Sequence, residues 1–293
     1  MSMKLEKGNF QMKIIKTIEE MKIYSEEQRQ NGKVIGFVPT MGYLHEGHIS
    51  LLERSKKECD ITILSIFVNP TQFAPNEDLN KYPRDLERDT ELAILTGVNA
   101  VFLPEVKEMY PENYSTYVNV EGLTEGLCAK SRPTHFKGVA TVVTKLFNIT
   151  KARKAYFGQK DAQQLLVIKR MVEDLNMDVE IITCKIIREK DGIAKSSRNM
   201  YLSMDQRKEA VVLSKSLDEA KHMIEQGERN ANIIKKKIQE MMQESKEADV
   251  DYIEIVDANS LKAIEEINGK VLIALAVKFG STRLIDNVIV EVM

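Results

Sequence analysis

The spacing of hydrophobic and polar residues changes repeatedly along the first two thirds of the chain. Residues 13–30 follow the period of about 3.6 residues of an amphipathic helix, whereas residues 34–38 form a short apolar run typical of a buried strand. The same two patterns then alternate. Further strands are predicted at residues 61–68, 100–103, 154–157 and 179–184, and further helices at 49–59, 84–96, 139–147 and 161–175. Alternating strands and helices predict an α/β fold with a parallel sheet covered on both faces.

The pattern changes after about residue 187. Residues 203–206 have the spacing of a capping box before a long helix, and a second helix is predicted at 231–244. Strands with little helix between them follow at residues 250–256, 271–279 and 284–292. This order predicts a small α+β domain. We therefore expect two closely packed domains, residues 11–187 and residues 188–293.

Composition and charge narrow the class of protein. With 43% hydrophobic and 29% charged residues and a net charge of −2, the chain resembles an ordinary globular protein without a nucleic-acid-binding surface. Its longest apolar run, residues 271–277, is too short to cross a membrane, and residues 1–10 lack the apolar core of a signal peptide. Cys59, Cys128 and Cys184 have no metal or disulfide spacing. We expect a cytoplasmic protein that binds neither nucleic acid nor membranes.

The most informative segment is residues 39–48, Pro-Thr-Met-Gly-Tyr-Leu-His-Glu-Gly-His, between a predicted strand and a predicted helix. A glycine-containing turn at a helix start offers N–H groups and the positive end of the helix dipole to an anion. Gly42 and Gly47 allow the backbone to approach a phosphate. His45 and His48 would share one face of a first helical turn and donate hydrogen bonds to charge developing on that phosphate. The alternatives are surface histidines or two metal ligands, although no nearby cysteine or aspartate completes a zinc site.

Three other segments place polar residues after predicted strands or at the domain boundary. Asn69 and Gln72 follow the second strand, although Asn-Pro is also ordinary turn chemistry. Residues 158–161 begin a helix, and their lysine and aspartate suit a phosphate and its magnesium ion, although a plain helix cap also explains the glycine and aspartate. Residues 195–198, Lys-Ser-Ser-Arg, are either a solvated charged loop or a loop that closes over a ligand.

Together these segments resemble the pantothenate synthetase (pantoate–β-alanine ligase) family, and the resemblance runs from about residue 12 to the end of the chain. The matching blocks are residues 39–48, 67–73, 82–85, 157–161 with Gln164, and 196–199. The resemblance implies a Rossmann-like doubly wound parallel sheet, a smaller C-terminal α+β lid domain and a homodimer. It also implies that ATP with Mg²⁺ activates pantoate as pantoyl adenylate, releasing pyrophosphate. The amine of β-alanine then displaces AMP and forms pantothenate.

The resemblance also implies which residues line the site. The implied ATP-binding residues are Met41, Gly42, Tyr43, Leu44, His45, Glu46, Gly47, His48, Gly158, Gln159, Lys160, Asp161, Ile187, Lys195, Ser196, Ser197 and Arg198. The implied catalytic residues among them are His48, which is the proton donor, His45, Lys160 and Arg198.

The acceptor substrates and the metal involve a smaller set. Gln72 and Gln164 would bind pantoate, and Gln72 would also place β-alanine. Asp161 would approach the magnesium ion of ATP. Asn69 and Tyr82 would help to enclose the site, while Arg132 and His135 lie in another family-like block without an assigned role.

Lys195 departs from the family, which usually carries methionine or leucine there. With lysine, the segment is more similar to the mobile phosphate-binding loop of class I aminoacyl-tRNA synthetases. Other functions remain open. A nucleotidyltransferase for a phosphate-bearing substrate would need more basic residues around its acceptor pocket. A non-catalytic nucleotide-binding regulator would tolerate loss of His48 or Lys160, and both are present here.

Overall fold

The computed structural model describes residues 12–75 and 77–292. Residues 1–10, for which we expect no signal core, and Gln11, the first residue of the expected N-terminal domain, lie outside the described residues. The chain forms two compact units. Among the described residues, the first unit holds 12–120, 132–159 and 167–185, and the second holds 121–131, 160–166 and 186–292.

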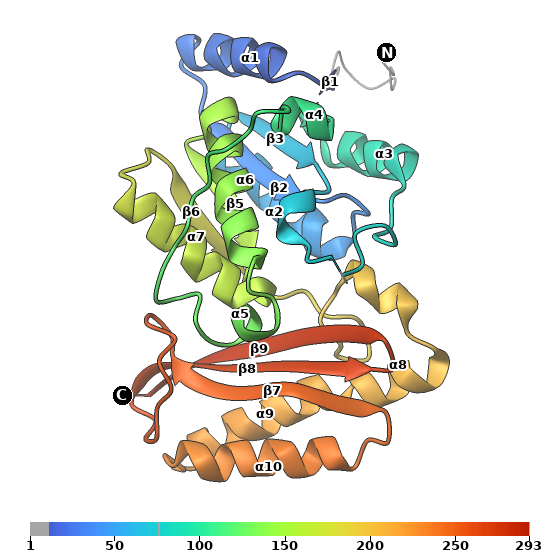
Figure 1. Cartoon of the computed structure of the whole chain (residues 1–293), viewed down its shortest axis with the longest axis vertical. Coiled ribbons are helices and arrows are strands. Elements are labelled where there is room, and N and C mark those ends of the chain that lie inside the picture. The colour runs from blue at the N-terminus through green and yellow to red at the C-terminus, as the bar shows by residue number, and fades with distance from the viewer. Residues whose placement is uncertain (1–11, 76, 293) are drawn as a thin grey trace. The chain divides into compact units, whose positions relative to one another are not determined.

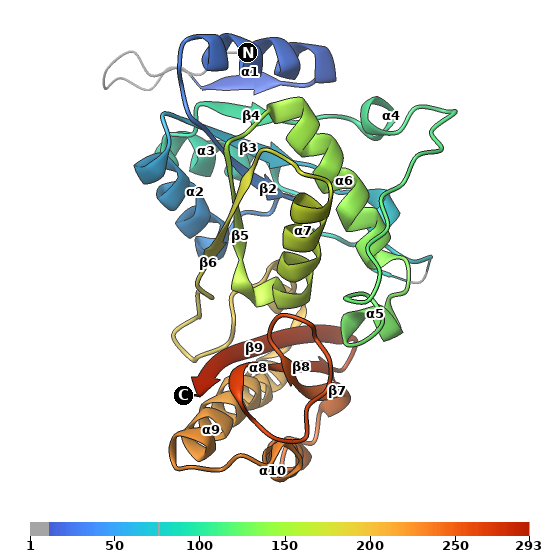
Figure 2. The same cartoon turned by 90° about the vertical axis from the view of Figure 1, so that its left-hand side faces the viewer.

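The first unit is built on a parallel six-stranded sheet with the strand order β1-β4-β3-β2-β5-β6. Its strands are β1 (Lys13–Ile15), β2 (Ile35–Thr40), β3 (Ile61–Ile66), β4 (Ala100–Phe102), β5 (Lys154–Gly158) and β6 (Glu180–Cys184). The helices are α1 (Ile18–Gln30), α2 (Glu46–Glu58), α3 (Leu86–Thr96), α4 (Val106–Met109), α6 (His135–Thr150) and α7 (Ala162–Asp174), whose first residues belong to the second unit. Figure 1 and Figure 2 show α2 and α3 on one face of this sheet and α6 on the other. The predicted α/β fold is therefore confirmed.

The segment at residues 13–30 is not a single helix. Lys13–Ile15 is a strand that pairs in parallel with β4, and α1 begins after Thr17, whose side chain forms a capping box with Glu20. The two isoleucines of β1 favour a strand, and a partner almost ninety residues away satisfies their backbone groups, so tertiary pairing overrides the helical period.

Two further helix boundaries differ from the sequence prediction. Helix α2 begins at Glu46 and not at residue 49, which places the histidine motif at its first turn. The single long helix expected after residue 203 is two helices, α8 (Met204–Ala210) and α9 (Val212–Glu225), although the predicted capping box of Ser203 and Gln206 is present. Short helical segments, such as α5 (Cys128–Ser131) and the 3₁₀ helices η1 (Pro70–Gln72), η2 (Gln159–Asp161) and η3 (Ser197–Tyr201), carry too few residues for a periodic signal.

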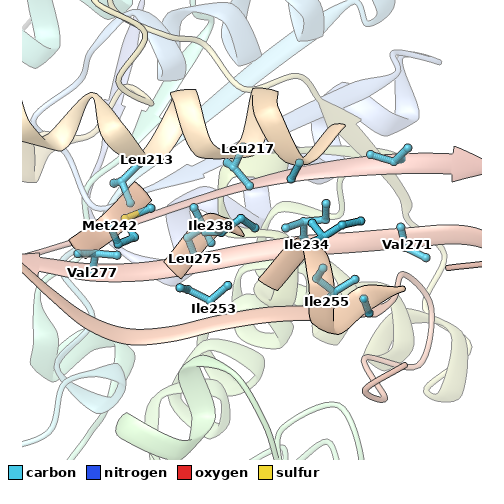
Figure 3. Close-up of a cluster of buried hydrophobic side chains, with 14 of the residues drawn as sticks. Leu213, Leu217, Ile234, Ile238, Met242, Ile253, Ile255, Val271, Leu275 and Val277 are labelled. Atoms are coloured by element: carbon cyan, nitrogen blue, oxygen red, sulfur yellow. The ribbon is translucent and has the colours of Figure 1, made fainter. Parts of the chain in front are cut away.

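The second unit contains an antiparallel sheet of β7 (Ala248–Asp257), β8 (Gly269–Phe279) and β9 (Thr282–Val292), together with α8, α9 and α10 (Ala231–Gln243). Figure 3 shows the core between these layers, where Leu213 and Leu217 of α9 and Ile238 of α10 pack over alternate residues of β8 such as Leu275. The other face of β8 is also covered, since Leu272 packs in a separate cluster. Burial on both faces explains the uninterrupted apolar run at residues 271–277.

The structure also describes the three cysteines and the length and polarity of the helices. Cys128 and Cys184 are buried and Cys59 is half-buried, and all three are free thiols. Among the helices of residues 12–292 that the structure describes, none combines the length and the apolar character needed to cross a membrane.

A close backbone contact joins α6 to η1 and positions the segment after β3. A Cβ on Gly138 would lie 2.3 Å from the carbonyl oxygen of Thr71 and 2.6 Å from the nitrogen of Gln72. Both neighbours are backbone atoms, which cannot move aside without shifting η1.

We therefore expect Gly138→Ala to destabilise the protein by about 1–3 kcal/mol, the usual effect of an added methylene in a packed site. This exceeds the gain of about 0.5–1 kcal/mol that alanine brings to a helix. Urea unfolding followed by circular dichroism measures the difference. Gly126→Ala is the matched control, because no atom lies within 4 Å of its added Cβ. Equal unfolding free energies for the two variants would contradict the backbone contact.

Candidate active site

The turn between β2 and α2 is held in an unusual conformation by a buried carboxylate. Gly42 and Tyr43 have φ values of 85° and 52°, both in the left-handed region. The carboxylate of Asp89, which is 1% exposed, accepts hydrogen bonds from the backbone N–H groups of Tyr43 at 2.7 Å and Leu44 at 2.6 Å. Burial raises the pKa of Asp89, and these two hydrogen bonds oppose the increase. A Cβ on Gly42 would lie 3.0 Å from Asp89 Oδ2, so glycine is required on two grounds.

Arg88 completes this support. Its guanidinium donates to the carbonyl oxygen of Leu44 at 2.9 Å and lies over the ring of Tyr43 at 5.4 Å from the centroid. Residues of α3 therefore bond two N–H groups and one carbonyl oxygen of the turn, and the N–H of Gly42 donates to the hydroxyl of Thr40 at 3.2 Å. This support was not predicted from the sequence, although Asp89 and Ala93 lie four residues apart on the same buried helix face, where an aspartate is unexpected.

His45 and His48 are brought together as predicted, and they also begin the helix. His45 is the N-cap of α2 and its Nδ1 accepts from the N–H of Gly47 at 3.2 Å, while His48 Nδ1 accepts from the N–H of His45 at 3.3 Å. The two rings stack with centroids 4.0 Å apart and an interplanar angle of 25°. Because both Nδ1 atoms accept, each neutral ring carries its proton on Nε2 and can donate from there. The pair therefore offers two N–H donors at a helix N-terminus, where an anion is stabilised.

The amides after β3 are joined directly. Asn69 is 1% exposed, and its Nδ2 donates to Oε1 of Gln72 at 3.1 Å and to the carbonyl oxygen of Gly138 at 3.2 Å. Gln72 Nε2 in turn lies 3.1 Å from Sδ of Met41, a residue of the histidine turn. The structure thus places Gln72 beside the predicted nucleotide-binding turn, and it explains Asn69 as more than turn chemistry.

Arg132 and His135, to which the sequence analysis assigned no role, hold the backbone of Gln72. Nδ1 of His135 lies 2.9 Å from the carbonyl oxygen of Gln72, and Nε2 lies 3.3 Å from Nη1 of Arg132. Since arginine can only donate, Nε2 accepts and Nδ1 carries the proton that binds Gln72. Arg132 is fixed by a bidentate pair with Glu77, with distances of 2.5 and 2.9 Å.

Lys160, Asp161 and Gln164 lie in the second unit. Lys160 Nζ is 4.0 Å from Asp161 Oδ1, and its carbonyl oxygen accepts from Asn287 at 3.0 Å. The neighbouring Asp286 is 1% exposed at its side chain and pairs with Arg188 at 2.6 and 3.1 Å. Burial raises the pKa of Asp286, whereas Arg188 and the charge of Lys160 act against the increase. Gln164 is half-buried in α7.

The loop with two cations is organised by Glu189. Its carboxylate accepts from Nδ2 of Asn199 at 2.7 Å, pairs with Arg207 at 2.5 Å and lies 3.9 Å from Lys195 Nζ. Burial pushes the pKa of Glu189 upward, but the bonds from Asn199 and Arg207 and the charge of Lys195 outweigh it, so the pKa lies below the usual value. A hydrogen bond of 2.8 Å from the N–H of Lys195 to the carbonyl oxygen of Ile187 closes the base of this loop.

The short helix in this loop is capped by one of the predicted site residues. Ser196 accepts from the N–H of Arg198 at 3.3 Å and starts η3, whose first residue, Ser197, is buried. The serines therefore have a local structural role beside the one that the sequence predicts.

The predicted site residues are thus distributed over both units. The first unit gathers residues 41–48 and Gln72, with Gly158 and Gln159 at the end of β5. The second unit holds Lys160, Asp161, Gln164, Ile187 and the Lys-Ser-Ser-Arg segment.

Comparison with known proteins identifies the family. The family model described as pantoate-beta-alanine ligase matches residues 13–289. A curated pantothenate synthetase of Acetivibrio thermocellus is 63% identical, over 96% of this chain and 100% of that protein. One from Caldicellulosiruptor saccharolyticus is 58% identical with the same coverage.

Solved structures agree with the sequence comparison. The crystal structure of pantothenate synthetase from Thermus thermophilus has a TM-score of 0.90 and 43% identity, and the match covers 94% of this chain and 99% of that one. A Francisella tularensis pantoate-beta-alanine ligase, described as complexed with beta-gamma ATP and beta-alanine, has a TM-score of 0.77 and 34% identity, over 94% of this chain and 97% of that one. The chain belongs to the pantoate–β-alanine ligase family.

Proposed function

We propose that the chain makes pantothenate in two chemical steps, through a pantoyl adenylate that its own residues activate and hold. As a member of its family the chain is an ATP-dependent ligase of pantoate and β-alanine. We propose the route of this reaction and the role of each residue in it. A carboxylate is a poor acyl donor because its leaving group would be oxide, whereas AMP leaves readily. Adenylylation therefore replaces one difficult step by two easier ones.

The observation that carries the proposal is the stacked histidine pair at the start of α2. In the first step the pantoate carboxylate attacks the α-phosphate, and negative charge grows on the phosphate oxygens and on the departing pyrophosphate. Two Nε2–H donors beside a helix N-terminus suit such charge, and they need no rearrangement because Nδ1 of each ring is already held by backbone N–H groups. We assign His48 as the proton donor and His45 as its neighbour on the phosphate.

The other roles follow the chemistry of the side chains. Residues 41–48, Gly158, Gln159 and Asp161 would line the nucleotide, with Ile187 beside adenine, and Lys160, Ser196, Ser197 and Arg198 would hold the phosphates and ribose. Gln72 and Gln164 would bind pantoate, and Gln72 would then place β-alanine. In the second step the β-alanine amine attacks the acyl carbon, the acyl–phosphate bond breaks and AMP leaves.

We also assign a magnesium ion to Asp161, together with the phosphates of ATP. The Asp161 side chain is 49% exposed, and a single carboxylate with phosphate oxygens and water suits Mg²⁺. Among residues 12–75 and 77–292, no three His, Cys, Asp or Glu side chains are grouped to hold a metal ion, which favours an ion carried mainly by the substrate. Such an ion would neutralise phosphate charge.

The assembly and compartment are proposed as well. We infer a homodimer from the family resemblance, with residues 11–187 as the nucleotide- and pantoate-binding domain and residues 188–293 as a lid. Three free thiols without a disulfide fit a reducing cytoplasm.

The two-step route predicts exchange before amide formation. With ATP, Mg²⁺ and pantoate alone, the enzyme should incorporate labelled pyrophosphate into ATP, since adenylylation is reversible and precedes the attack of β-alanine. Omission of pantoate is the control and should abolish the exchange. Formation of AMP only in the presence of β-alanine, without any exchange, would rule out a free-standing adenylylation step.

The role of His48 predicts a kinetic defect larger than the binding defect. His48→Ala should slow single-turnover adenylylation by about 10²–10³, the usual effect of losing one donor to developing charge, with a much smaller change in ATP affinity. Because His48 also accepts the N–H of His45, the thermal midpoint must be measured in parallel. If the His48→Ala variant folds and adenylylates pantoate at a near-normal rate, His48 has only a structural role at the start of α2.

Lys195 should matter less than Arg198. The Nζ of Lys195 lies 3.9 Å from Glu189, so the carboxylate partly offsets the attraction of this lysine to a phosphate. We expect Lys195→Met to keep turnover within about tenfold and to weaken ATP binding mainly at low salt, where screening is weak. Arg198→Ala should lower turnover far more. Steady-state kinetics of both variants at two ionic strengths test this prediction. If Lys195→Met abolishes turnover while Arg198→Ala is mild, the roles that we assign to the two cations are reversed.

A further inference from the structure

The side-chain amide of Asn69 can have only one orientation. Its Oδ1 accepts from the backbone N–H of Thr71 at 3.4 Å, and its Nδ2 donates to the carbonyl oxygen of Gly138 at 3.2 Å. A backbone N–H can only donate and a carbonyl oxygen can only accept, so exchanging the oxygen and nitrogen of this amide would lose both bonds. These two backbone contacts therefore determine which atom of the Asn69 amide is oxygen and which is nitrogen, even without a bound ligand.

Tyr110 strengthens this orientation. Its hydroxyl donates to Oδ1 of Asn69 at 2.8 Å, and the hydroxyl of Thr71 donates to the same oxygen at 3.0 Å. Burial raises the pKa of Tyr110 to about 12, so the phenol keeps its proton at neutral pH. The ring of Tyr110 is itself packed against Tyr114, with centroids 4.9 Å apart.

The orientation of the Asn69 amide also determines the orientation of the Gln72 amide. The second N–H of Asn69 donates to Oε1 of Gln72 at 3.1 Å, which directs the NH₂ group of Gln72 away from Asn69. That NH₂ group lies 3.1 Å from Sδ of Met41, and a thioether is only a weak acceptor. An amide NH₂ has two donors, and within the described part of the chain no other acceptor is recorded for it. Gln72 therefore retains donor capacity beside the histidine turn.

We propose that Asn69 and Tyr110 are positioning residues that make Gln72 a hydrogen-bond donor, so that Gln72 recognises an oxygen of the acid substrate that accepts. This inference rests on the proposed role of Gln72 in binding pantoate, and it deepens that role. The chemical group recognised is a carboxylate oxygen or the lone pair of a hydroxyl, both present on a hydroxy acid. A side chain that presents an oxygen at the same position would repel the same group.

The donor role is tested by two variants of nearly equal size. Gln72→Met removes the donor without adding charge, and Gln72→Glu replaces it with an acceptor. Both should raise the KM for pantoate in pyrophosphate exchange, about tenfold or more for methionine and still more for glutamate, with the KM for ATP changed less than threefold. If glutamate binds pantoate better than methionine does, Gln72 accepts from the substrate and the proposal is wrong.

The positioning role is tested by a double-mutant cycle. Tyr110→Phe should raise the KM for pantoate about three- to tenfold in the wild-type background and less than twofold in the Gln72→Met background, because the effect of Tyr110 acts through Gln72. Asn69→Ala should follow the same pattern with a larger effect. If the Asn69→Ala variant fails to fold, the double-mutant cycle of Tyr110→Phe with Gln72→Met still tests the positioning role.

Tyr114→Phe is the matched control, since Tyr114 contacts the same ring while its hydroxyl makes no hydrogen bond recorded within the described residues. It should leave every KM unchanged. Equal effects of Tyr110→Phe in both backgrounds would overturn the positioning role alone. A normal KM for pantoate in Gln72→Met would overturn the assignment of Gln72 to pantoate, and the positioning role with it.

Discussion

The hydrogen bonds from Tyr43 and Leu44 to the carboxylate of Asp89 are the constraint on which the histidine turn depends. Gly42 adopts its positive φ without strain, whereas Tyr43, with a φ of 52°, is strained by about 1–3 kcal/mol and persists there only because its neighbours fix it. Asp89 supplies that fixation from α3, and it remains buried because two N–H groups compensate its lost hydration. The conformation of this turn then determines where α2 begins and in which direction the imidazoles of His45 and His48 point.

The two histidines combine a structural role at the start of α2 with the chemical role that we propose for them. His45 and His48 cap α2 through Nδ1, and this use of Nδ1 leaves the proton of each neutral ring on Nε2. Helix capping therefore selects the tautomer with the proton on Nε2, which the proposed contact with a phosphate requires. Loss of a cap usually lowers stability by about 0.5–2 kcal/mol, so a histidine variant changes folding and catalysis together. Kinetic data on such variants have meaning only when the folded fraction is known.

Periodicity was sufficient to predict most of the fold, because β2, β3, β5 and the helices between them each carry a spacing that tertiary contacts reinforce. It failed where the deciding contact is distant. The strand at Lys13–Ile15 exists because β4 pairs with it. The histidine cap was missed because histidine is not among the usual capping residues, so the helix was expected to begin three residues later.

For the candidate site, the sequence predicted the motif residues but not the residues that support them. The motif residues were found because glycine, histidine and lysine are rare enough in those positions to suggest chemistry. Their supports were not found, since the partners of Asn69 and Gln72 come from Gly138 and His135, more than sixty residues away. Such supports are ordinary residue types whose role depends on distance in space and not on spacing in sequence.

The cations of the second unit are paired with its carboxylates to different degrees. Arg188 is committed to the buried Asp286, whereas Lys195 shares Glu189 with Arg207 and Asn199. Lys195 Nζ lies 3.9 Å from this carboxylate, whereas Arg188 makes two contacts of 2.6 and 3.1 Å with Asp286. Charge-assisted bidentate pairs of this kind are among the strongest hydrogen-bonded contacts in proteins. Removing Arg188 would leave Asp286 as an uncompensated buried charge, so this arginine is committed to the fold of the second unit.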